Sequence, residues 1–224
     1  MTDINEVHSI IRQLLVQEKT GKSTPEEIDK ALDLAQIDYF NSLRPQQGAQ
    51  MPVYAQGTYV AEALNPFLRT VEFNNGNTPG GVMTIPQSEQ LLTVMTQNVA
   101  NSVTLYSPVP VVNPDELAHR LRSQIVMPTE ADPVVIFETN KKLQFYPAAP
   151  KAGKVIYLVL PTKPKWGYLE DGRNLKYSPA RSTDLEWNVS YIPQVITRAL
   201  QYLGVSLSAD AVFQVAQQKQ MEVR

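Results

Sequence analysis

The chain has 224 residues, of which 43% are hydrophobic and 19% are charged, and its formal net charge is −2. This composition is typical of a globular protein with enough length for one large domain or two small ones. The nearly neutral charge lacks the basic excess of most nucleic-acid-binding proteins. Because the chain contains no cysteine, disulfides, thiolate catalysis and cysteine-based zinc sites are excluded.

The N-terminal sequence MTDINEVHSI lacks the basic start and the apolar core of a signal peptide. No apolar run in the sequence approaches the length that spans a membrane. We therefore expect a protein that is made and used in soluble form, without a membrane partner.

Residues 1–50 are predicted to form an N-terminal helical hairpin. Apolar side chains recur at spacings of three and four in both helices. Thr24, Pro25 and Glu27 have the order of an N-cap, a first helical residue and a capping box, which starts the second helix after Gly21. The two apolar faces consist of Val7, Ile10, Ile11, Leu14 and Leu15, and of Ile28, Leu32, Ala35, Tyr39, Phe40 and Leu43.

Residues 51–187 are predicted to form a β-rich domain, because proline-rich turns separate short runs of β-branched and aromatic residues. Asn140-Lys141 suits a tight hairpin turn. The loop of residues 74–81, rich in Asn and Gly, is expected to be exposed and mobile. The expected strands are Phe67–Phe73, Gly81–Ile85, Leu91–Gln97, Ser102–Tyr106, Val134–Glu138, Leu143–Tyr146 and Lys154–Leu160.

One helix is expected to interrupt these strands after Asn113-Pro114-Asp115-Glu116, with Leu117, Leu121 and Ile125 on its buried side. Residues 188–224 are predicted to be helical again. Gly204 supplies the left-handed stop of a first helix, and Ser208 can cap a final one. The sequence thus predicts an α+β fold, in which the N-terminal hairpin and the C-terminal helix pair pack together and a mainly antiparallel β domain lies between them in sequence.

Residues that could carry chemistry are few. His8 and His119 lie in predicted helices without a local partner to orient them, so both are expected to be surface residues. Asp184 and Glu186 could do acid–base work, yet carboxylates near a helix start more often answer the helix dipole. The residues Asp171–Asn174 favour a turn over a calcium loop. No nucleotide-binding or metal-ligand motif is present in the sequence, so neither a cofactor nor a metal is expected.

An aromatic and basic cluster follows the strand KVIYLVL, where Pro161 and Pro164 fix the chain direction. Its aromatic rings could be ordinary core, anchors of a protein interface, or platforms for nucleic-acid bases, in decreasing order of expectation. Trp166 and Trp187 are expected to clamp a joint between the β domain and the helices. The cluster consists of Lys163, Lys165, Trp166, Tyr168, Lys176, Tyr177 and Trp187, and the interface candidates are Lys163, Lys165, Trp166, Tyr168 and Tyr177.

Several stretches of the sequence resemble virion structural proteins of tailed phages, in particular head-to-tail connector or neck ring proteins of crAss-like phages of Bacteroidota. The stretches are ALDLAQIDYFNSLRPQ, DELAHRLRSQIVMPTEADPVVIFETNKKLQFYP, VIYLVLPTKPKWGY and STDLEWNVSYIPQVITRALQYLGVSLSADAVFQVAQQK. The plan of helical ends around a β middle is also similar to the tail tubular or adaptor proteins of short-tailed phages. The Asn- and Gly-rich loop around Gly76 and the short N-terminal lead depart from this pattern.

The resemblance implies a non-enzymatic protein that forms a closed, dodecameric ring by head-to-tail contacts. Its partners would be copies of itself, the portal protein and other neck or tail ring proteins. It would line the channel through which DNA passes without sequence-specific contact, and it would be assembled in the bacterial cytoplasm and reside in the virion. Two alternatives stay open: a tail or baseplate adaptor that docks a fibre, another virion protein or a host glycan, and a glycan-cleaving enzyme that uses Asp184, Glu186 or Glu170.

Overall fold

A computed structural model describes residues 2–17, 23–44, 62–74, 76–85, 88–100, 103–138, 140–171 and 174–205. The chain has the α+β class that the sequence predicts. It divides into two compact units, a helical unit built from residues 1–67 and 161–224 and a β unit built from residues 68–160. Residues 161–187, predicted as the end of the β-rich domain, belong to the helical unit.

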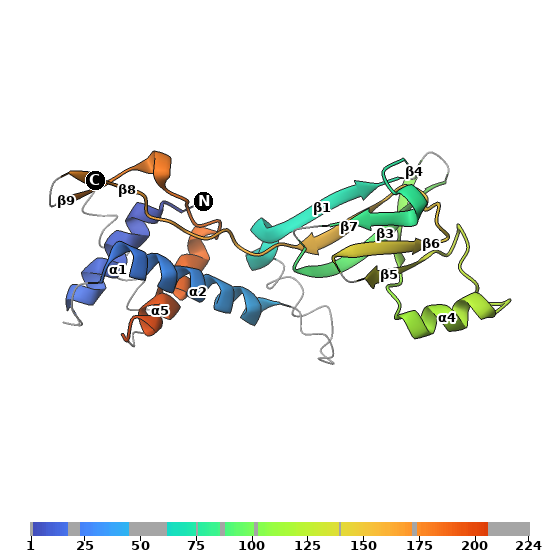
Figure 1. Cartoon of the computed structure of the whole chain (residues 1–224), viewed down its shortest axis with the longest axis horizontal. Helices are drawn as coiled ribbons and strands as arrows, with labels where there is room; N and C mark the ends of the chain where they lie inside the picture. The colour runs from blue at the N-terminus through green and yellow to red at the C-terminus, as the bar shows by residue number, and fades with distance from the viewer. Residues whose placement is uncertain are drawn as a thin grey trace. The chain divides into compact units, whose positions relative to one another are not determined.

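The main helices of the helical unit are α1 (Ile4–Gln17), α2 (Pro25–Leu43) and α5 (Ile192–Tyr202). Helix α5 packs against both N-terminal helices, as Figure 1 shows. The unit also contains the β8–β9 hairpin, Tyr168–Asp171 and Asn174–Tyr177, and three short 3₁₀ helices. These 3₁₀ helices are η1 (Asn65–Phe67), η3 (Pro179–Arg181) and η4 (Val189–Tyr191).

Local sequence signals explain where these helices begin and end. The Thr24 hydroxyl accepts a hydrogen bond from the Glu27 N–H, and the Glu27 carboxylate accepts one from the Thr24 N–H, so the predicted capping box is confirmed. Helix α5 has Pro193 in its first turn, and Gly204 follows its end with φ +85°, the left-handed conformation that glycine adopts without strain. The second C-terminal helix, predicted from Ser208 onward, lies outside the described residues.

Aromatic side chains form the centre of the helical unit. Trp187 is fully buried, with its ring centroid 4.6 Å from that of Phe67 and 5.0 Å from that of Tyr39. Phe40 meets Phe67 edge-on at 5.6 Å. These contacts join residues from α2, η1 and the segment before α5, so residues distant in the sequence share one core. The expectation that Trp187 belongs to the core is confirmed.

In its described part, the β unit contains two antiparallel sheets, the helix α4 (Pro114–Arg122) and the short 3₁₀ helix η2 (Pro79–Gly81), as Figure 1 shows for the sheets and α4. The four-stranded sheet has the order β1-β7-β3-β4, and the three-stranded sheet has the order β2-β6-β5. The strands are β1 (Leu68–Phe73), β2 (Val82–Thr84), β3 (Gln90–Ala100), β4 (Val103–Val109), β5 (Val134–Glu138), β6 (Lys142–Tyr146) and β7 (Gly153–Leu158). The seven strands expected in residues 67–160 therefore exist, with ends that shift by up to three residues.

The two sheets pack through aromatic side chains. Phe73 of β1 and Phe145 of β6 are buried with their ring centroids 4.6 Å apart. Gly153 lets β7 approach this core, since a Cβ atom there would lie 2.1 Å from the Met95 carbonyl oxygen and 2.5 Å from the Phe73 ring. Asn140 and Lys141 have φ values of 67° and 59°, as a tight turn between β5 and β6 requires, so the predicted hairpin is confirmed.

The helix of the β unit, α4 (Pro114–Arg122), begins at the predicted start signal. Leu117 is buried with Val112, Val134 and Ile136. Leu121 is 44% exposed and Ile125 is 94% exposed, so the prediction that both lie on the buried side is wrong. The helix ends at Arg122, before the helical spacing can bring Ile125 back to the sheet.

The Asn- and Gly-rich loop is only partly exposed. Asn74, Gly76 and Asn77 are exposed, whereas Thr78 is fully buried. The Asn74 side-chain oxygen accepts hydrogen bonds from the N–H groups of Gly76 and Asn77, which closes a compact turn.

Candidate functional site

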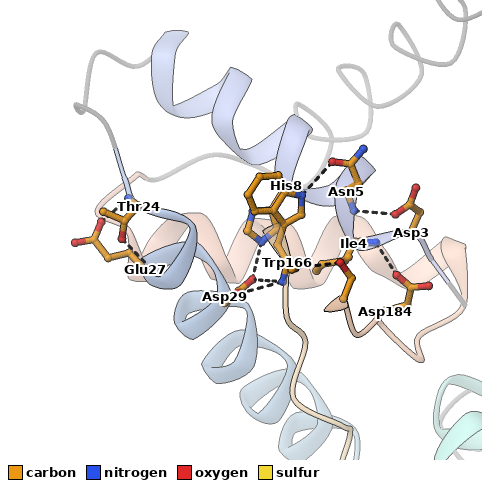
Figure 2. Close-up of polar contacts among 11 residues, drawn as sticks. Asp3, Ile4, Asn5, His8, Thr24, Glu27, Asp29, Trp166 and Asp184 are labelled. Atoms are coloured by element: carbon orange, nitrogen blue, oxygen red, sulfur yellow. Dashed lines mark hydrogen bonds and ion pairs between the residues drawn. The ribbon is translucent and has the colours of Figure 1, made fainter. Parts of the chain in front are cut away.

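The predicted interface candidates lie where residues 161–187 pass over the N-terminal helices. Trp166 is only 4% exposed. Its backbone N–H donates to both carboxylate oxygens of Asp29, at 3.0 and 3.1 Å, and its indole Nε1–H donates to Asn5 Oδ1 at 3.0 Å. Figure 2 shows that Asn5 of α1 and Asp29 of α2 hold Trp166 from two directions. Trp166 is therefore core, as the leading interpretation of the sequence predicts.

His8 shares the same carboxylate. Its Nε2 lies 2.7 Å from Asp29 Oδ1, and its ring stacks on Trp166 with centroids 5.5 Å apart and planes 13° apart. His8 is 1% exposed, so the prediction of a surface histidine is wrong. The helical spacing could have predicted the burial of His8, because His8 lies on the same helical face as Ile4, Ile11 and Leu15. His119, in contrast, is exposed on α4 as predicted.

Arg12 completes this cluster from α1. Its guanidinium carbon lies 4.5 Å from the centroid of the Trp166 ring. Partial burial lowers the pKa of Arg12 below its ordinary value, and the nearby Asp29 carboxylate opposes this effect. The cluster thus joins an aromatic face, a cation and a carboxylate inside the helical unit.

Two tyrosines of the β8–β9 hairpin lie beside Trp166. The ring centroids of Tyr168 and Tyr177 are 5.8 and 5.9 Å from that of Trp166. The Tyr168 hydroxyl donates to Glu26 of α2, and the Tyr177 hydroxyl donates to Asp3 at 3.3 Å. The first contact lowers the pKa of Glu26 and raises the pKa of Tyr168, while burial is the main cause of the raised pKa of Tyr177. The hairpin is thereby attached to the start of both N-terminal helices.

The two lysine candidates reach the surface. Lys163 Nζ lies 3.8 Å from Asp33 Oδ2, and its side chain is 82% exposed, so this ion pair contributes little stability. Lys165 is exposed, while its backbone pairs with Thr183. The structure therefore brings the five candidates together as a buried tryptophan, two half-buried tyrosines and two exposed lysines. Their role in an interface stays a prediction.

The carboxylates of Asp184 and Glu186, before α5, accept hydrogen bonds from backbone N–H and hydroxyl groups. Asp184 Oδ1 accepts a hydrogen bond from the Ile4 N–H at 3.1 Å, at the first residue of α1. The Glu186 carboxylate accepts from the Thr162 N–H at 3.4 Å and from the Thr162 hydroxyl at 3.1 Å. Asp184 therefore caps the N-terminus of a helix, the structural role that the sequence favours over acid–base catalysis. The capped helix is α1, however, and not α5, which follows Asp184 in the sequence.

Residues 161–187 are held at further points along their length. Buried Gln36 of α2 donates through Nε2 to the Thr162 carbonyl at 2.9 Å. Gly167 lies against Arg181, where an added Cβ would come within 2.4 Å of the Arg181 backbone. Asp171 of β8 pairs with Asn174 of β9, whereas residues 172 and 173, part of the predicted turn, lie outside the described residues. Neither of these two strands was expected from the sequence.

The arrangement is a junction of polar and aromatic contacts between residues 161–187 and helices α1 and α2, inside the helical unit. In the part of the chain that the structure describes, no group of three or more acidic or histidine side chains could hold a metal ion. A membrane-spanning helix is likewise not found among the described helices, because none of them is both long and apolar enough. No protein-family model matches the chain, and no curated protein matches it.

Proposed function

We propose that the chain is a structural virion protein that forms a closed ring in the portal–tail region of a tailed phage. The ring, dodecameric by the resemblance of the sequence, bridges the portal and the tail and lines the DNA exit channel. Its partners are copies of itself, the portal protein and other neck or tail ring proteins. DNA passes without sequence-specific contact. The protein is assembled in the bacterial cytoplasm and resides in the virion.

The observation that carries this proposal is the division of the chain into two compact units. The β unit is inserted into the helical unit between Phe67 and Pro161. Each unit has aromatic residues in its own core, so each can present a surface of its own. The returning segment is fixed to α1 and α2 by Asp29, Gln36 and Asp184. An adaptor between two neighbours could use one unit to contact each of them.

The contacts of the acidic and aromatic residues weigh against the alternatives. An acid–base pair must reach a substrate, whereas Asp184 and Glu186 already accept hydrogen bonds from Ile4 and Thr162. A glycan site built on Trp166 needs an open ring, and this ring is 4% exposed. Both observations favour a role in assembly.

Electron microscopy and native mass spectrometry of the purified chain test the proposal, with the chain alone and mixed with the portal protein of the same phage. Closed rings of one size are expected. Changing Lys163→Glu together with Lys165→Glu should weaken ring formation if this surface is the subunit contact, while Lys142→Glu, at the exposed first residue of β6, serves as the control. Strictly monomeric behaviour in both preparations contradicts the proposal.

A further inference from the structure

We draw no further inference here: the strongest candidate, the exposed apolar patch of Leu121, Ile125, Val126 and Met127 at the end of helix α4 and in the loop that follows it, carries none because nothing in the structure shows what covers it.

Discussion

The helical unit and the β unit use their charged residues in different ways. In the helical unit, carboxylates accept hydrogen bonds from backbone N–H groups of the same unit. Asp29 accepts one from Trp166, and Asp184 accepts one from Ile4. In the β unit, backbone hydrogen bonds link the strands into two sheets, and the edge strands β2 and β4 carry no charge. The difference indicates that side-chain carboxylates hold the helical unit together, whereas backbone ladders hold the β unit together.

The largest expected effect comes from the aromatic core of the helical unit. Trp187→Ala removes a fully buried ring and should lower the free energy of unfolding by about 3 to 5 kcal/mol. Val189→Ala nearby, at a side chain that is 60% exposed, should change it by no more than about 0.5 kcal/mol. Urea unfolding gives both values. Hydrogen exchange should rise more in α2 and α5 than in β3 and β7, and an equal rise in both units would contradict the division.

The partly buried carboxylate of Asp29 should contribute more to the free energy of unfolding than the more exposed carboxylate of Asp38 on the same helix. Asp29→Ala leaves the Trp166 N–H and His8 without their acceptor and should cost about 2 to 3 kcal/mol. Asp38→Ala removes an ion pair with Arg198 whose carboxylate is 54% exposed, and should cost at most about 1 kcal/mol. Equal losses in urea unfolding would show that the junction around Trp166 is not a special point of attachment.

In the β unit, the stability should depend more on close packing than on charged contacts. Gly153→Ala places a Cβ against the Met95 carbonyl and the Phe73 ring, and the forced shift should cost about 1 to 3 kcal/mol. Hydrogen exchange should rise in β1, β3 and β7. An unchanged midpoint of urea unfolding would contradict the close approach of these strands.

The smallest effect concerns the Tyr168–Glu26 contact. Because the pKa of Glu26 is lowered from 4.5, its stabilising contribution is present above that value and is lost as the pH falls through the lowered pKa. Because the pKa of Tyr168 is raised from 10.0, its contribution is present below that value and is lost as the pH rises through the raised pKa. The urea midpoint of the unaltered chain minus that of Tyr168→Phe should therefore be largest at neutral pH and vanish at both extremes. A difference that does not vary with pH would contradict this contact.

Local patterns predicted much of the fold. The capping box of Thr24 and Glu27, the Asn140-Lys141 turn and the stop at Gly204 depend on neighbouring residues, and the structure contains all three. The junction could be predicted only in part. The burial of Trp166 was expected, but its partners Asn5 and Asp29 lie far away in the sequence, so no local pattern indicates them.

The histidine and the short hairpin were missed for different reasons. His8 interrupts an apolar face, and only its buried contact with Asp29 shows that it completes that face. β8 and β9 have only four residues each. The sequence YLED of β8 does not alternate between polar and apolar residues, and the alternation in NLKY of β9 covers only those four residues. Their attachment to Glu26 and Asp3 holds them in the helical unit.

The most direct test of the proposed function is electron microscopy of the purified chain mixed with the portal protein of the same phage. The account predicts closed rings of one size, seated on the portal. A chain that stays monomeric in this mixture, and leaves the portal unoccupied, would contradict it.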